Sequence, residues 1–146
     1  MSRNAVLLVE DNSDDELLTI IALREAHPAI ELVVAHDGVE ALDFLFGTGA
    51  YAARDTKDVP QVVLLDMKLP RIDGLEVLRR MRADVRTHNI PVVMLSGSNQ
   101  DQDVEAAYDL GANSYVRKPI DFSQFTDVAR QLGLYWLALN QVPPRP

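Results

Sequence analysis

Short apolar runs alternate with longer amphipathic stretches along these 146 residues, and this alternation restricts the fold more than any other feature. The apolar runs predict five strands, at Ala5–Val9, Ile30–Ala35, Gln61–Asp66, Pro91–Leu95 and Ser114–Arg117. The amphipathic stretches predict five helices, at Asp14–Ala26, Val39–Phe46, Leu75–Asp84, Asp101–Leu110 and Asp121–Leu139. Strands that alternate with helices favour βαβ units and a mostly parallel sheet.

The first, third and fourth predicted strands are almost entirely apolar, as expected where helices cover both faces of a sheet. Right-handed crossovers then favour a doubly wound α/β fold of the flavodoxin-like (βα)5 kind, with strand order 2-1-3-4-5. We expect one domain over residues 1–146, with its core at about 4–133 and an extended last helix and proline-rich tail at 134–146. The longest irregular stretch, Gly47–Pro60, predicts a surface loop or a ragged helix extension.

The composition excludes several classes of function. The net charge of −8 opposes binding to phosphate backbones, so a protein partner or a divalent cation is expected rather than nucleic acid. Without cysteine the chain has no disulfide, thiolate metal site or cysteine nucleophile. The apolar runs are too short to span a bilayer and the N-terminus lacks a signal-peptide pattern, so we expect a cytoplasmic protein without a membrane partner.

Polar residues follow four of the predicted strands. The buried run "VVLL" ends at Asp66, the first strand ends at Glu10 and Asp11, the fourth at Ser96, and the fifth at Lys118. Sites in open α/β sheets lie at the carboxyl ends of the strands. In the predicted strand order these strands are neighbours, so the five side chains should converge.

Three carboxylates packed together repel one another, and a hard divalent cation relieves the repulsion. Mg²⁺ takes one or two carboxylates, a carbonyl and several waters. We predict Asp11 and Asp66 as its ligands, the backbone carbonyl of Lys68 as a third, and Glu10 as an outer or water-mediated partner.

A carboxylate beside Mg²⁺ can attack a phosphoryl group and form an aspartyl phosphate. The transition state spreads negative charge over the equatorial oxygens. Lys118 can contact one oxygen, and the hydroxyl of Ser96 with nearby backbone N–H groups another. Gly97 has no side chain to obstruct the phosphoryl group.

Four segments resemble the receiver domain of two-component response regulators. They are "LLVEDN", "VVLLDMKLPRIDGLEVL", "PVVMLSGS" and "GANSYVRKP", which occur in the family's order and cover roughly residues 4–133. The resemblance implies that Asp66 is the phosphoacceptor, that Glu10 and Asp11 form the acid pocket, and that Ser96 and Lys118 contact the phosphoryl group.

The resemblance also implies that Tyr115 is an aromatic switch coupled to Ser96, and that the Lys118–Pro119 peptide bond is cis. Glu10 stands where Asp is common, and Ser96 stands where Thr is commoner. The long loop, the long last helix and the expected lack of a following DNA-binding domain resemble small regulators partnered with phytochrome-type histidine kinases. Such a protein is a phosphoacceptor that catalyses its own phosphorylation and slow dephosphorylation, without turnover of a small molecule.

Three other functions are alternatives to this one. A Mg²⁺-dependent phosphatase with an aspartyl phosphate typically needs a second carboxylate two residues after the nucleophile, where this chain has Lys68. A flavodoxin-like carrier needs a glycine- and hydroxyl-rich loop after the first strand, where this chain has "EDNSDD". A degenerate receiver that only binds partners is disfavoured by the complete set of site residues.

The last helix carries an apolar seam with spacings of 3, 4, 3, 4 and 3, at Phe122, Phe125, Ala129, Leu132, Trp136 and Leu139. We expect its second half to extend beyond the domain and form a homodimer interface; the alternative is that it folds back onto the domain.

Simpler interpretations suffice for three other groups. The run Arg79–Arg82 is interpreted as the solvated face of a helix, and Asp14–Glu16 as acids that stabilise a helix start. The histidines, at His27, His36 and His88, are assigned to the surface.

Overall fold

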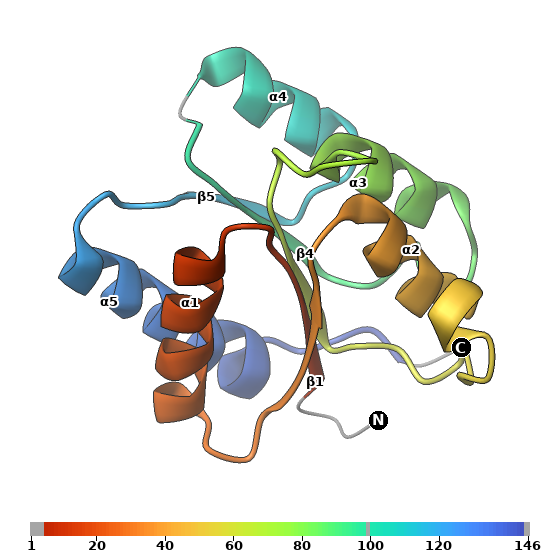
Figure 1. Ribbon diagram of the computed structural model, residues 1–146, viewed down its shortest axis with the longest axis horizontal. Coiled ribbons are helices and arrows are strands. Elements are labelled where there is room, and N and C mark those ends of the chain that lie inside the picture. Colours follow the sequence, from red (N-terminus) through yellow and green to blue (C-terminus); the bar gives the residue numbers. More distant parts are fainter. Residues whose placement is uncertain (1–4, 99, 145–146) are drawn as a thin grey trace.

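The computed structural model describes residues 5–98 and 100–144, and these form one parallel sheet with helices on both faces (Figure 1). The sheet order is β2-β1-β3-β4-β5, which confirms the predicted flavodoxin-like topology. Its strands are β1 (Ala5–Val9), β2 (Glu31–Ala35), β3 (Val62–Leu65), β4 (Val92–Ser96) and β5 (Ser114–Arg117). The helices are α1 (Ser13–Ala26), α2 (Gly38–Phe46), α3 (Gly74–Ala83), α4 (Asp101–Asp109) and α5 (Phe122–Gly133).

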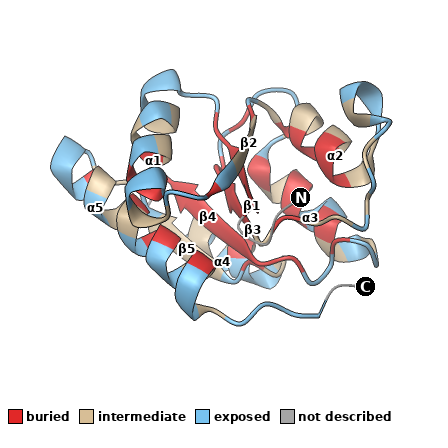
Figure 2. Cartoon of the chain, turned by 90° about the horizontal axis from the view of Figure 1, so that it is seen from below, coloured by how far each residue is buried: buried red, intermediate tan, exposed pale blue. Residues whose placement is uncertain are grey.

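The alternation of side chains along the strands divides the core into two clusters, one on each face of the sheet. Leu7 and Leu65 point to the face covered by α2 and α3, whereas Leu8 and Leu64 point to the face covered by α1 and α5. Every residue of β1, β3 and β4 is buried, while the edge strands β2 and β5 are partly exposed (Figure 2). The central strands therefore have apolar neighbours on both faces, as their sequences predicted.

Side-chain caps fix where α1, α2, α3 and α5 begin. In each case an Asn or Asp side chain accepts the backbone N–H three residues further on, which satisfies a donor that the helix itself leaves free. The capping residues are Asn12, Asp37, Asp73 and Asp121.

The loop between α2 and β3 is ordered by contacts with α2. It contains the short 3₁₀ helix η1 (Gly49–Tyr51), and the Tyr51 ring packs edge-on against Phe44 with centroids 5.2 Å apart. The guanidinium group of Arg54 lies over the Phe44 ring, 4.1 Å from its centroid, and Arg54 Nε donates to the Phe44 carbonyl at 2.7 Å.

The end of the chain differs from the predicted single long helix. After α5 a π-helical segment, η2, runs over Leu134–Leu139. Leu137 is buried and Trp136 packs on the same cluster, while the Gln61 side chain donates to both of their carbonyls at 3.3 and 3.1 Å. The expectation that this half extends beyond the domain is therefore wrong for Trp136 and Leu137, which fold back onto it.

The predicted seam holds only in its middle. Phe125, Ala129 and Leu132 are buried, but Phe122 and Leu139 are exposed. Residue 4 of the predicted core and residues 145–146 of the predicted tail lie outside the described residues.

The prediction for Arg79–Arg82 is wrong at its last two positions. Met81 is fully buried, and Arg82 donates to the carbonyls of Ile90 at 2.8 Å and Gly111 at 2.9 Å. Among the described residues, no helix is both long enough and apolar enough to cross a membrane.

Candidate functional site

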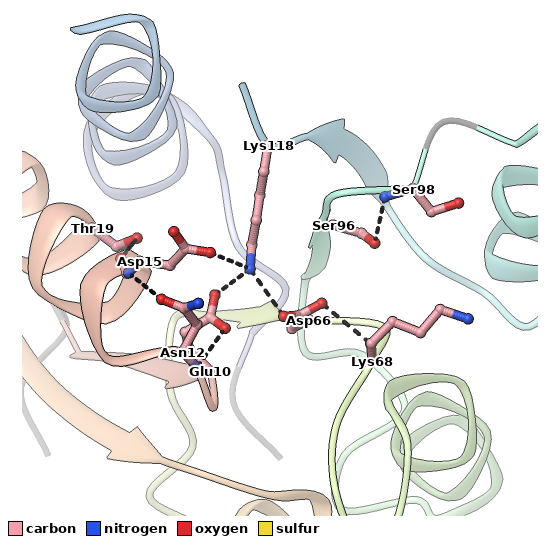
Figure 3. A network of polar contacts seen from close by, with 9 residues as sticks. All are labelled: Glu10, Asn12, Asp15, Thr19, Asp66, Lys68, Ser96, Ser98 and Lys118. Carbon is pink, nitrogen blue, oxygen red and sulfur yellow. Dashed lines mark hydrogen bonds and ion pairs between the residues drawn. The ribbon is translucent and has the colours of Figure 1, made fainter. Parts of the chain in front are cut away.

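The polar residues at the strand ends meet at one edge of the sheet (Figure 3). Backbone hydrogen bonds continue the parallel pairing beyond the strands: Asp66 N donates to Val9 O at 3.1 Å, and Lys118 N to Ser96 O at 2.7 Å. These bonds fix the backbone from which the side chains project. The carboxyl ends of β1, β3, β4 and β5 therefore lie side by side, as the strand order predicted.

Lys118 lies at the centre of the site. Its Nζ donates to Glu10 Oε1 at 2.5 Å, to Asp66 Oδ2 at 2.9 Å and to Asp15 Oδ2 at 3.1 Å. An ammonium group has three protons, so these three carboxylates satisfy all of its donors. The lysine side chain is only 10% exposed, so the surrounding residues keep the ammonium group at this position.

The pKa values of Glu10 and Lys118 are both raised in the site, for different reasons. Burial raises the pKa of Glu10 to about 7, against the opposing effect of Lys118, because a charged carboxylate loses its hydration there. Burial alone would lower the pKa of Lys118, but hydrogen bonding to Glu10 and the charge of Asp66 outweigh it and raise that pKa. Lys118 is therefore a fixed cation at neutral pH.

Three carboxylates of the site have a geometry that suits a divalent cation. Oxygens of Glu10, Asp11 and Asp66 all lie within 4.8 Å of one another; Glu10 and Asp66 are buried and Asp11 is exposed. These are hard oxygen donors, the kind that Mg²⁺ prefers. The three carboxylates come from the ends of two adjacent strands and offer their oxygens to one point, so the residues fit the metal.

A hollow of about 380 Å³ opens beside Asp11. Asp11, Met67 and Lys68 line it near the site, and Asp103 lines it from α4. Figure 3 shows the Lys68 side chain directed away from Asp66, while its backbone N–H donates to Asp66 Oδ1 at 3.2 Å.

A second set of hydrogen bonds connects the end of β4 with α4 and β5. Buried Ser96 accepts the backbone N–H of Ser98 at its hydroxyl oxygen at 3.2 Å, and Ser98 Oγ donates to Asp103 Oδ2 at 2.5 Å. The Tyr115 hydroxyl donates to the Ser98 carbonyl at 2.8 Å. Ser96 and Tyr115 are thus joined through one loop residue.

The sequence model of the response regulator receiver domain family matches residues 6–130, which is most of the chain. The chain belongs to the response regulator receiver family.

One relative is similar over nearly its full length. Rcp1 of Synechocystis sp. is 33% identical over 138 residues, with 94% of this chain and 92% of Rcp1 covered. Its Mn²⁺-bound crystal structure has a TM-score of 0.89 at 32% identity and covers 97% of this chain and 99% of Rcp1.

Two further structures extend this similarity. The phosphorylated cyanobacterial phytochrome response regulator RcpA has a TM-score of 0.91 at 35% identity, covering 98% of this chain and all (100%) of its own. The bacteriophytochrome response regulator AtBRR has a TM-score of 0.74 at 47% identity, with 97% and 100% covered.

Two details of this receiver differ from the sequence analysis. The Lys118–Pro119 peptide bond was expected to be cis, but no cis peptide bond occurs between described residues, so it is trans. Asp15 was assigned only to the start of α1, yet it contacts Lys118. Asp14 and Asp15 are both acids in the first turn of α1, so the sequence alone gave no signal that singled out Asp15.

Proposed function

We propose that this receiver accepts a phosphoryl group on Asp66 from a phosphohistidine of a sensor histidine kinase, with Mg²⁺. The observation that carries the proposal is the meeting of Asp66 with Glu10, Asp11 and Lys118 from three different strand ends. We expect the transfer to take place in the cytoplasm, where a kinase can be charged by ATP.

The transfer forms one bond and breaks one bond. An Oδ atom of Asp66 attacks the phosphorus, the bond from phosphorus to the histidine nitrogen breaks, and the imidazole leaves with the electron pair. Glu10, Asp11 and Asp66, with the carbonyl of Lys68, would hold the Mg²⁺, which neutralises charge on the carboxylates and the phosphoryl oxygens.

The chain's own residues stabilise the remaining charge. Lys118 already contacts Asp66 at 2.9 Å, so its ammonium group can donate to a phosphoryl oxygen attached there. The hydroxyl of Ser96 keeps its proton for a second phosphoryl oxygen, because its oxygen is the acceptor in its bond with Ser98. A side chain at Gly97 would meet no atom within 4 Å, so this position leaves room for the group.

Phosphorylation would change the surface through the loop after β4. A Ser96 hydroxyl drawn toward the phosphoryl group pulls on the Ser98 N–H that it accepts. Ser98 in turn contacts Tyr115 through its carbonyl and Asp103 of α4 through its hydroxyl. The new charge at Asp66 therefore biases the position of Tyr115 and of the first turn of α4.

We assign kinase docking to exposed apolar residues on α1 and in the segment after Lys118. Leu17 and Ile21 lie on α1, and Ile120 and Phe122 follow Lys118; their exposed fractions are 58%, 45%, 97% and 66%. A phosphohistidine must come within bonding distance of Asp66, so the kinase has to cover this edge of the sheet. The similarity to the phytochrome response regulator RcpA and the bacteriophytochrome response regulator AtBRR favours a phytochrome-type kinase as the partner.

We also propose a homodimer through the end of the chain. Leu134, Tyr135, Leu139 and Val142 are exposed on η2 and the segment after it, beside the part that folds back. Exposed apolar surface of this kind is typical of interaction sites. Sedimentation of the wild type and of a Leu139→Glu variant tests this: we expect a dimer for the former and a monomer for the latter, and a wild-type monomer contradicts it.

Phosphate incorporation tests the central proposal. The purified protein is treated with acetyl phosphate and MgCl₂, and intact mass is measured. We expect one phosphate adduct that is lost with EDTA and in Asp66→Asn, and kept in the matched control Asp55→Asn. An adduct that persists in Asp66→Asn would exclude Asp66 as the acceptor.

A further inference from the structure

We infer that Asp15 is a positioning residue that holds Lys118 for phosphoryl transfer, an inference that rests on the function proposed above. Lys118 Nζ lies 3.1 Å from Asp15 Oδ2, so the lysine has a carboxylate acceptor on α1 besides those at the ends of β1 and β3. Figure 3 shows Asp15 and Asp66 on opposite sides of the ammonium group.

Asp15 belongs to a closed ring of hydrogen bonds, here called the anchoring ring, formed by Glu10, Asn12, Asp15 and Lys118. Asn12 N donates to Glu10 Oε2 at 3.2 Å, and Asp15 N donates to Asn12 Oδ1 at 3.0 Å. Lys118 closes the ring by donating to both Glu10 and Asp15. The start of α1 is thus tied to the lysine that follows β5.

The usual role of an acid at this helix position does not explain these contacts. Asp15 is the third residue after the cap Asn12, where a longer acidic side chain often reaches back to the backbone N–H of the capping residue. Here that N–H is bonded to Glu10 instead, and the Asp15 carboxylate faces Lys118. Asp15 therefore has a contact that helix capping does not require.

The anchoring ring leaves one proton of Lys118 for the reaction. Glu10 and Asp15 each accept one N–H of the ammonium group, so only the bond to Asp66 has to be exchanged for a phosphoryl oxygen. Without Asp15, one N–H loses its acceptor, and once the bond to Asp66 is exchanged for a phosphoryl oxygen only Glu10 still anchors the ammonium group. A misplaced donor stabilises the transition state less, because catalysis depends on the orientation of such groups.

Phosphorylation kinetics of two charge-matched variants test this role. Asp15→Asn should lower the maximum rate with acetyl phosphate by about tenfold, the usual effect of weakening one charge-assisted hydrogen bond. The half-saturating concentrations of acetyl phosphate and Mg²⁺ should stay within about twofold of the wild type, since uniform binding is not affected. The control Asp14→Asn removes the same charge from the same helical turn at an exposed position, and should react like the wild type.

Further measurements separate positioning from folding. Asp15→Glu keeps the carboxylate and should recover most of the rate, and all variants should unfold at similar temperatures. Equal rates for Asp15→Asn and Asp14→Asn, or a loss confined to the half-saturating concentrations, would overturn the inference. A wild-type protein that takes up no phosphate would instead overturn the proposed function itself.

Discussion

Gly74 lies where the first turn of α3 touches the loop that carries Asp66, and replacing it by alanine is a direct test of how tightly this loop is held. An added Cβ would lie 2.1 Å from the Asp66 carbonyl oxygen and 2.9 Å from Met67 Cα. The Gly74 N–H also donates to the Met67 carbonyl at 2.9 Å. Any shift of α3 away from the loop therefore loses a hydrogen bond as well.

The size of the effect follows from the overlap. The Cβ and the Asp66 oxygen must separate by about 0.9 Å to reach 3.0 Å, below which such contacts are essentially not seen. The atoms that the Cβ would meet, Asp66 O and Met67 Cα, are backbone atoms, so no side chain can rotate to relieve the clash. Overpacking of this kind costs about 1–3 kcal/mol, and the better helix propensity of alanine offsets less than about 1 kcal/mol of it. We expect Gly74→Ala to lower the free energy of unfolding by about 2 kcal/mol.

Urea unfolding followed by the fluorescence of Trp136, the one tryptophan of the chain, measures this change. A loss of about 2 kcal/mol corresponds to a melting temperature lower by roughly 4–8 °C for a chain of this size. Phosphorylation should slow by about tenfold or more, because the clash displaces the backbone of Asp66, the phosphoacceptor that we propose.

Gly97→Ala is the matched control for stability. A Cβ there meets no atom within 4 Å, so the free energy of unfolding should stay within about 0.5 kcal/mol of the wild type. If Gly74→Ala were as stable as Gly97→Ala and reacted at the wild-type rate, the tight contact between α3 and the Asp66 loop would be refuted.

Three more predictions concern the site and its support. Gly97→Ala should slow phosphorylation without loss of stability, because the methyl group occupies the space that we assign to the phosphoryl group; an unchanged rate in the mass assay contradicts that assignment. Arg82→Ala and Arg82→Lys should each lower the free energy of unfolding, measured in urea, by roughly 2–3 kcal/mol, because neither side chain replaces the guanidinium group that donates to several carbonyls. Arg80→Ala, at an exposed position, should lower it by less than about 0.5 kcal/mol. In metal-free protein, the pKa of Glu10 is about 7 in the folded state and about 4.5 in the unfolded state. Between these pH values the folded state binds more protons, so the free energy of unfolding should fall as the pH rises from about 4.5 to about 7. Glu10→Gln should flatten this fall, and equal pH slopes for both proteins would speak against a buried, protonated Glu10.

The sheet could be predicted from the sequence because its signals are local. Each central strand is a continuous apolar run, and its burial on both faces follows from that pattern alone. The convergence of Glu10, Asp66 and Lys118 then follows from the strand order, since carboxyl ends of parallel neighbours share one edge. Apart from the last helix, each end of a predicted strand or helix lies within one residue of the observed end.

The features that the sequence analysis missed depend on contacts between distant segments. Leu137 is buried in the core cluster on the α1 and α5 face of the sheet. The carbonyl of the preceding residue, Trp136, accepts a hydrogen bond from the side chain of Gln61, which lies 75 positions away in the sequence. Arg82 belongs to a run of charges typical of a solvated helix face, yet its partners include Ile90 and Gly111. The pattern around a residue describes its own helix, not the carbonyls that another segment brings to it.

Asp15 illustrates the same limit within the site. An acid in the first turn of a helix is explained locally by the helix dipole, and nothing in "EDNSDDE" distinguishes Asp15 from Asp14. What separates them is Lys118, which lies 103 positions away and comes within 3.1 Å of Asp15 only in the folded chain. Two acids with identical local explanations thus differ in their contact with the reacting centre, and comparing their Asn variants measures the part of the site that only the fold creates.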